Sequence, residues 1–326
     1  MRSPLLDVPG AVAADAPDDV VAGHYGDLYG EQRALARGEA VVDRSNREVV
    51  RISGPDRLTW LNDLSSQQLK TLAPGHWTQT LLLDAQGRLE HHLTLIDDGE
   101  SVLAHVEPGT AADLVGFLDR MRFMLRVEVA DVTADFAVVS TGVGDDRLIP
   151  RDLLPVVDEE LGRRLAGLWA YEALRIEAHV PREGFDTDHK TIPHEVGWIG
   201  TAVQLDKGCY RGQETVARVH NLGHPPRRLV FLHLDGSVDT LPPHGAPVTL
   251  DGAEVGVVGS SARHHELGPV ALAVVKRTVP VDATLLAGGV AAAQEVVVPP
   301  DAGRNVAIDP ALRGRKFDVP AGRRLV

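Results

Sequence analysis

The sequence contains a single cysteine, Cys209, in 326 residues, and only 4% of its residues are aromatic. One cysteine excludes a disulfide within the chain and any metal cage built from the chain's own cysteines. An iron–sulfur cluster would need further ligands from another chain or from small thiols. This low cysteine content fits a reducing, cytoplasmic compartment.

Long apolar runs are also missing, and acidic residues outnumber basic ones. No apolar run approaches the ~20 residues of a membrane span, and the first 20 residues lack the apolar core of a secretory signal. The chain has 33 Lys and Arg against 46 Asp and Glu, a formal net charge of -13. We therefore expect no membrane partner, and the acidic balance argues against nucleic acid as a direct partner.

The length exceeds what one ordinary core holds, so we expect several packed units. Residues 1–30 are expected to be a flexible N-terminal segment, since residues 1–20 are rich in Ala, Asp and Pro. The main region is placed at 31–227 and a small β-barrel at 228–300. The barrel is predicted from short apolar stretches separated by Gly and Pro, at 229–234, 248–250, 253–260, 270–275 and 295–298.

A basic tail is placed at 301–326. Residues 303–326 contain six Lys or Arg and only two Asp. A solvated tail is the favoured interpretation, and binding to RNA or to an acidic partner is the other.

Hydrophobic periodicity predicts a mixture of strands and helices in the main region, with a loop-rich stretch at 181–215 and a charged insert at 141–165. The predicted strands lie at 39–43, 49–53, 77–83, 89–96, 101–106, 122–129 and 136–140. The predicted helices begin at 56, 110 and 165, and the last two end at 121 and 177.

Cys209 lies in an unusual polar stretch, residues 206–214, with Lys207 and Arg211 close in sequence. Most free cysteines are small buried hydrophobic residues. Here the neighbours are charged residues and glycines, and nearby cations favour the reactive thiolate. We therefore favour a functional thiol: a nucleophile, a redox switch or a single ligand to a shared metal centre.

Glu195 lies in a second polar loop, at 192–197, bounded by Pro and Gly. Its carboxylate is expected either to solvate a turn or to accept paired N–H donors from a flat heterocycle. The histidine pairs at 91–92 and 264–265 lack the i, i+4 spacing of a helical metal site, so no metal site is predicted there.

The sequence KGCYRGQE at 207–214 resembles the K-G-C-Y-x-G-Q-E signature of the YgfZ family. These are folate-binding relatives of the glycine-cleavage T-protein, an aminomethyltransferase. The resemblance covers roughly residues 31–280. Supporting matches lie at 43–45, 52–54, 83–87, 175–184, 192–195, 228–229, 256 and 260–261.

The resemblance implies an α+β fold of two pseudo-repeated folate-binding units plus a C-terminal β-barrel, arranged as a ring around a central channel that holds tetrahydrofolate. It implies that Glu195 binds the pterin and that Lys207 faces the folate tail, with Tyr210 and Arg211 beside them. Cys209 would be a reactive thiol or a transient cluster ligand.

One position departs from the T-protein pattern. The segment GRLEHHL at 87–93 has His92 where the T-protein has a catalytic aspartate, and Glu90 is the nearest carboxylate. A histidine does not reproduce an anion's stabilisation of positive charge on a folate nitrogen. The departure disfavours ordinary aminomethyl transfer, while folate binding is still expected.

The first hypothesis is therefore a folate-binding protein that supports iron–sulfur cluster assembly or repair. Its partners would be iron–sulfur client or assembly proteins, and its effects on tRNA modification would be indirect. The alternative is a folate-dependent one-carbon transferase acting on a small amine, with Glu90 in place of the aspartate.

Overall fold

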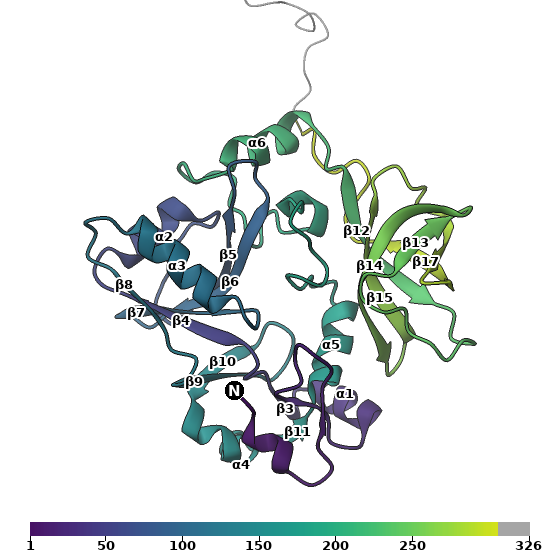
Figure 1. Cartoon of the computed structure of the whole chain (residues 1–326), viewed down its shortest axis with the longest axis horizontal. Coiled ribbons are helices and arrows are strands. Elements are labelled where there is room, and N and C mark those ends of the chain that lie inside the picture. The colour runs from purple at the N-terminus through teal and green to yellow at the C-terminus, as the bar shows by residue number, and fades with distance from the viewer. Residues whose placement is uncertain (306–326) are drawn as a thin grey trace, which may run out of the picture.

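The computed structural model describes residues 1–305, which form a mixed α+β fold with two larger sheets, a two-stranded sheet and a closed six-stranded barrel (Figure 1). The predicted α+β class and the predicted C-terminal barrel are confirmed. No helix within this described range is both long and apolar enough to cross a membrane.

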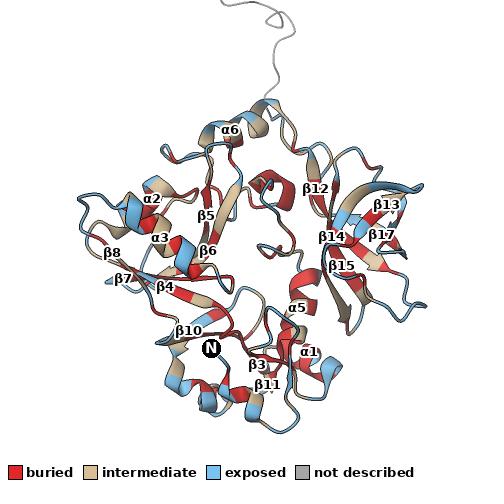
Figure 2. Ribbon diagram, viewed as in Figure 1, coloured by how far each residue is buried: buried red, intermediate tan, exposed pale blue. Residues whose placement is uncertain are grey.

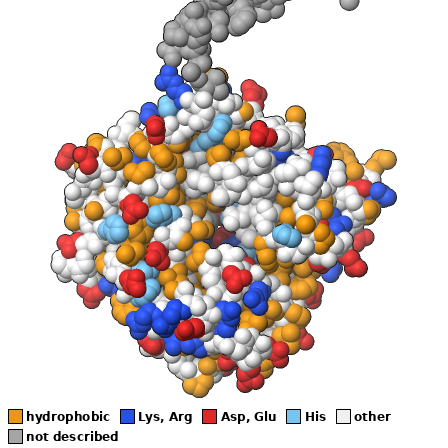
Figure 3. All heavy atoms as spheres, turned by 180° about the vertical axis from the view of Figure 1, so that it is seen from behind, with side chains coloured by type: hydrophobic (Ala, Val, Ile, Leu, Met, Phe, Trp, Pro, Cys, Tyr) orange, Lys and Arg blue, Asp and Glu red, His pale blue; other side chains and the backbone are white. Residues whose placement is uncertain are grey.

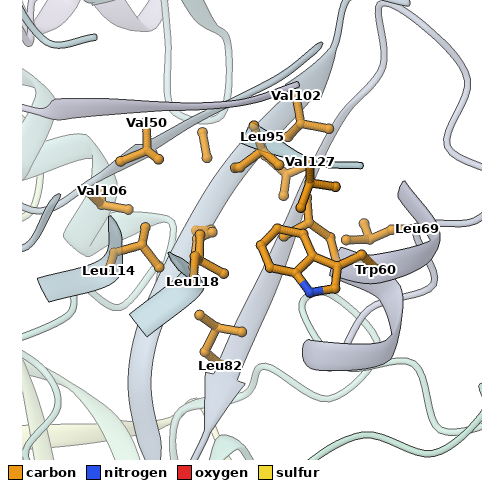
Figure 4. Packing of buried hydrophobic residues seen from close by; sticks show 14 of the residues in the cluster. Val50, Trp60, Leu69, Leu82, Leu95, Val102, Val106, Leu114, Leu118 and Val127 are labelled. Carbon is orange, nitrogen blue, oxygen red and sulfur yellow. The ribbon is translucent and has the colours of Figure 1, made fainter. Parts of the chain in front are cut away.

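The first sheet has five strands in the order β5-β6-β7-β4-β8. Helices α2 (Arg57–Leu64) and α3 (Ala111–Met121) pack on it through the apolar cluster shown in Figure 4. Alternate residues of a strand face the same side, and Leu93 and Leu95 accordingly both enter this cluster. The strands are β4 (Glu48–Ser53), β5 (Trp77–Leu83), β6 (Leu89–Asp97), β7 (Ser101–Val106) and β8 (Glu128–Asp131).

The second sheet has four strands in the order β10-β9-β3-β11 and is covered on both faces. Adjacent Val41 and Val42 point to opposite faces, and both are fully buried. Val42 packs with α1 (Leu28–Ala36) and α5 (Leu168–Glu177), and Val41 packs with η2 (Arg151–Val156) and α4 (Val157–Leu161). The strands are β3 (Ala40–Asp43), β9 (Phe136–Ser140), β10 (Asp146–Pro150) and β11 (Arg164–Ala166).

The barrel closes in the order β12-β15-β14-β13-β16-β17. Figure 2 shows buried residues on these strands as well as on both sheets. The strands are β12 (Arg227–Leu234), β13 (Pro247–Leu250), β14 (Ala253–His264), β15 (Gly268–Lys276), β16 (Thr284–Ala287) and β17 (Val290–Val296). Two further elements, η3 (Pro193–Val196) and α6 (Gln213–Leu222), follow α5 and precede the barrel in the sequence.

The prediction that residues 1–30 are flexible is wrong. They contain η1 (Pro4–Asp7), β1 (Val12–Ala13) and β2 (Ala22–His24), and Leu5 and Val21 are buried. Asp18 is buried as well and accepts hydrogen bonds from Arg182. The composition of this segment suggested disorder. Composition alone does not show that Leu5 and Val21 are buried, or that Asp18 pairs with the distant Arg182.

Several helices and strands have other bounds than the sequence predicted. The strand predicted at 122–129 is reduced to β8, because Phe123 takes a left-handed backbone conformation (φ 47°) and turns the chain. The insert at 141–165 carries β10, η2, α4 and β11, and the helix predicted from 165 begins at Leu168. Helix α6 and strand β16 were not predicted. Residues 306–326 of the predicted basic tail lie outside the described residues.

We predict that Gly167→Ala detaches the N-terminal segment. A Cβ at Gly167 would lie 2.1 Å from the carbonyl oxygen of Gly23 in β2, so the backbones must separate. We expect a loss of about 1–3 kcal/mol in the free energy of unfolding, measured by urea denaturation, and faster proteolysis before residue 28. Gly116→Ala in α3 is the control: its Cβ would meet only the end of the Arg120 side chain at 3.5 Å. Equal stability of the two variants would contradict the prediction.

Candidate functional site

A cavity of about 380 Å³ lies where the first sheet, the second sheet and α5 meet. We call it the central cavity. Apolar and aromatic surface comes from Trp77 and Tyr171, while charged side chains make up much of the rest. Figure 3 shows the face opposite that of Figure 1, with acidic and basic side chains interspersed and a narrow hollow near its centre. The lining residues used below are Arg44, Arg47, Trp77, Gln79, His92, His105, Glu107, Asp146, Tyr171, Glu172, Arg175, Ala178 and Arg182.

Arg182 connects three parts of the chain at the wall of this cavity. Its guanidinium donates to both carboxylate oxygens of Asp18 (2.7 and 2.9 Å) and to Glu107 (2.9 Å), which follows β7. Glu172 of α5 lies 3.8 Å away. Arg182 is 7% exposed, so removal of this cation would leave the buried carboxylate of Asp18 unpaired.

Glu107 is held as an anion. Its burial would raise its pKa, but attraction to Arg47 and Arg182 outweighs burial and lowers the pKa to about 2. Arg47 forms an ion pair with one oxygen of Glu107 and Arg182 with the other. The carboxylate is therefore fixed in charge and orientation.

Arg175 joins α5 to the barrel next to the cavity. It donates to Glu172 (2.5 Å), to Asp186 (2.9 Å) and to the hydroxyl of Ser260 in β14 (2.7 Å). Asp186 in turn accepts from the backbone N–H of Ser260 at 2.8 Å. This contact positions the barrel against the helix that lines the cavity.

His105 is a neutral imidazole between two charged groups. Arg47 donates from Nε to His105 Nδ1 (3.3 Å), so the proton of His105 resides on Nε2 and is donated to Asp146 (2.9 Å). Burial lowers the pKa of His105 to about 4, although Asp146 partly opposes this effect. Asp146 also pairs with Arg44 at 2.7 Å.

His92, the residue expected in place of the T-protein aspartate, lines the cavity. Its Nε2 lies 3.0 Å from the Gln79 side-chain oxygen, and its ring packs 4.7 Å from that of Trp198. Burial, with repulsion from Arg47, lowers the pKa of His92 to about 3. The side chain is therefore uncharged and offers the cavity neither an anion nor a cation.

Glu195 lies outside the central cavity and is almost fully buried (1% exposed). Arg227 donates to both of its oxygens (2.9 and 2.8 Å), and the backbone N–H of Ile192 donates at 3.2 Å. Arg227 also pairs with Asp188 at 2.6 Å. Arg227 also lines a second cavity, of about 670 Å³, between residues 184–191 and the barrel. The pterin-binding role predicted for Glu195 stays a prediction, and the structure shows its oxygens already hydrogen-bonded.

Lys207 and Tyr210 serve the packing of the stretch 206–214. The Lys207 ammonium donates to the backbone carbonyls of Asn62, Ser65 and Gln67 at the end of α2, and burial lowers its pKa to about 8. Tyr210 belongs to an apolar cluster between the first sheet and the barrel, and burial raises its pKa to about 12. Neither side chain lines a cavity described above.

Cys209 is exposed, and the two cations near it in sequence have other partners. Lys207 is held by carbonyls, and Arg211 pairs with Glu90 (2.8 Å) on the surface. Gly212 packs closely against the turn between β5 and β6, where an added Cβ would lie 2.6 Å from the oxygen of Asp84. The stretch 206–214 is thus held in place by its neighbours, while the thiol of Cys209 faces outward. Glu90, the partner of Arg211, lies outside the central cavity.

Sequence reasoning found His92 but missed the charged residues of the cavity. They come from separate segments, and no local motif unites Arg47, Glu107 and Arg182. The matches at 43–45 and 175–184 were one signal that touched the site. A second signal was the presence of isolated Arg residues inside apolar surroundings, such as Arg175 in α5.

Comparisons with known proteins agree with this architecture. Residues 227–313 match the family described as glycine cleavage T-protein C-terminal barrel domain. An aminomethyltransferase of Synechococcus sp. (strain CC9311) is 28% identical over 313 residues, covering 76% of this chain and 82% of the relative. A putative chloroplastic transferase of Arabidopsis thaliana is 22% identical, and the alignment covers 70% of this chain and 62% of that protein.

The crystal structure of the glycine cleavage system aminomethyltransferase T from Bartonella henselae has the same fold. It superposes with a TM-score of 0.74 and 18% sequence identity, covering 93% of this chain and 98% of that one. The barrel match and the aminomethyltransferase relatives support a relationship with proteins of the glycine-cleavage T-protein type. Assignment to the YgfZ family in particular stays a prediction.

We predict that Arg182→Ala is strongly destabilising. The substitution leaves the buried carboxylate of Asp18 without a cation and removes one of the two cations of Glu107, so the free energy of unfolding should fall by about 3–5 kcal/mol. Urea denaturation followed by circular dichroism measures the loss. Arg126→Ala is the matched control, because Arg126 forms an exposed ion pair with Asp56 and such pairs contribute little. A loss at Arg182 no larger than that at Arg126 would contradict the analysis.

Proposed function

We propose that the protein binds tetrahydrofolate in the central cavity and acts as a folate-dependent one-carbon transferase. The observation that carries the proposal is a cavity rich in hydrogen-bonding groups, in a chain whose relatives along most of its length are named aminomethyltransferases. In this proposal the two sheets and the barrel form a ring, and the cavity is part of its central channel.

The side chains of the cavity fit a flat, polar heterocycle. Trp77 and Tyr171 provide aromatic surface, and Glu172 and Gln79 provide acceptors for amino and ring N–H groups. Glu172 is the best placed of the carboxylates to accept, since its side chain is 19% exposed, compared with 10% for Glu107. A volume of about 380 Å³ is within the range of small-molecule sites.

Cationic side chains suit the acidic tail of a folate. Arg44 and Arg47 reach the cavity from the chain that joins β3 to β4, and guanidinium groups bind carboxylates through paired hydrogen bonds. Tetrahydrofolate, when bound, supplies the nitrogen that takes up a one-carbon unit. The protein's own residues orient the ring and keep water away from it.

The neutral His92 limits the reaction that the cavity supports. An uncharged imidazole beside Gln79 accepts or donates one hydrogen bond but does not stabilise a cation as an aspartate does. The proposed substrate is a small amine, and Glu90 does not replace the aspartate, because it lies outside the cavity.

We predict that Ala178→Trp blocks tetrahydrofolate binding. Ala178 is exposed and lines the cavity just after α5, so a large ring there fills the entrance while the core stays intact. We expect at least a ~10-fold rise in Kd, or about 1.4 kcal/mol, by isothermal titration calorimetry. Ala253→Trp, on the exposed start of β14, is the control and should bind as the wild type does. Equal Kd values for both variants would reject the cavity as the folate site.

A second candidate function, support of iron–sulfur cluster assembly or repair, is favoured by one observation. The single thiol, Cys209, is exposed and lies outside the central cavity, a position suited to contact with a client or assembly protein rather than with folate. Effects on tRNA modification would follow indirectly. The cytoplasmic location and these partners stay predictions.

We predict that Cys209→Ala lowers the activity of iron–sulfur enzymes in a host that lacks its own copy of the gene, while tetrahydrofolate affinity is unchanged. Because the thiol is exposed, stability should change by less than ~0.5 kcal/mol. The measurement is enzyme activity in extracts, with protein abundance checked alongside and Cys209→Ser as a second variant. Full rescue by both variants would remove the thiol from the mechanism.

A further inference from the structure

One carboxyl group beside the central cavity has no cation to pair with. Glu183 lies in the loop after α5, next to Arg182, and forms no ion pair among residues 1–305. Its Oε2 accepts the backbone N–H of His92 at 2.9 Å. Glu183 therefore contacts the strand whose His92 side chain lines the cavity.

The point where β6 and β7 stop pairing explains why Glu183 is there. Strands β6 and β7 pair from Thr94–His105 to Asp97–Val102, so β6 extends beyond that pairing at His92. Its N–H would lack a partner at this point, and Glu183 supplies one. Glu107 follows directly after β7. The carboxyl groups of Glu107 and Glu183 therefore lie at the same end of the β6–β7 pairing.

The two carboxyl groups have opposite surroundings. Glu107 is paired with Arg47 and Arg182 and is ionised, with a pKa of about 2. Burial raises the pKa of Glu183 to about 7; repulsion from Glu107 adds to this, and the His92 N–H and Arg47 partly oppose it. Two neighbouring carboxyls with separated pKa values divide the roles of fixed anion and proton carrier.

The other groups around Glu183 do not exchange protons near neutral pH. His92 and His105 are neutral, with pKa values of about 3 and 4. Arg47 and Arg182 stay charged. Glu183 is thus the group of this cluster that titrates in the physiological range.

We propose that Glu183 is a proton-exchanging carboxyl beside the central cavity, protonated in much of the free protein and ionised when a ligand with N–H donors or positive charge binds next to His92. The O–H bond of Glu183 breaks and the proton passes to solvent, with no oxidation or reduction. This inference rests on the proposed folate site and identifies the carboxyl that serves it.

Titration calorimetry with tetrahydrofolate at pH 7 tests the proposal. Measuring the heat in phosphate and in Tris, which differ in ionisation enthalpy, gives the number of protons released. A group with a pKa near 7 is about half protonated at pH 7, so the wild type should release on the order of half a proton. Glu183→Gln keeps an acceptor for the His92 N–H and should abolish that release, whereas Glu128→Gln, at an exposed carboxyl of β8, should not change it. Identical release from wild type and Glu183→Gln would overturn the inference.

A second measurement needs no ligand and separates this inference from the folate proposal. Below pH ~4.5 both folded and unfolded chains keep the Glu183 proton, and between 4.5 and 7 the unfolded chain alone releases it. Wild-type stability should therefore fall, relative to Glu183→Gln, as pH rises from 5 to 7, and the difference should level off above pH 8. A difference that does not vary with pH would refute the protonated carboxyl. Failure of tetrahydrofolate to bind, with this pH dependence intact, would instead count against the proposed function.

Discussion

The pairing of buried charges around Arg182 and Arg175 is the constraint on which the rest of the structure depends. Each of these cations is nearly inaccessible to solvent. Arg182 pairs with carboxylates from distant parts of the chain, and Arg175 pairs with Asp186 and donates to Ser260 of the barrel. A buried charge without its partner costs several kcal/mol, so the N-terminal segment, the end of β7, α5 and the barrel must all arrive together. The same convergence encloses the central cavity.

This arrangement separates two features that lie together in the sequence. The stretch 206–214 contains the one thiol and two cations, yet Lys207 fastens the end of α2 and Arg211 pairs with Glu90. Tyr210 and Gly212 pack against the first sheet and its β5–β6 turn. The stretch therefore holds the end of α2 and the β5–β6 turn in place with its thiol facing outward, and the proposed binding cavity lies elsewhere, at the junction of the two sheets.

Local patterning predicted the elements well and the site poorly, for physical reasons. Strands such as β5 and β6 and helix α3 bury one face, and the sequence shows that periodicity directly. The order of residues 1–24 and the wall of the cavity depend instead on contacts such as Asp18–Arg182, which join residues 164 positions apart. Glu183 escaped notice for the same reason: its surroundings come from Glu107 and His92, and neither is near it in sequence.

The central claim is that folate chemistry belongs to the cavity lined by His92, Trp77 and Tyr171. A crystal structure of the protein with tetrahydrofolate tests it most directly. The account predicts electron density for the pterin between these side chains, within hydrogen-bonding distance of Gln79 or Glu172. Density for the pterin against Glu195 and Arg227 instead, with the central cavity empty, would contradict it.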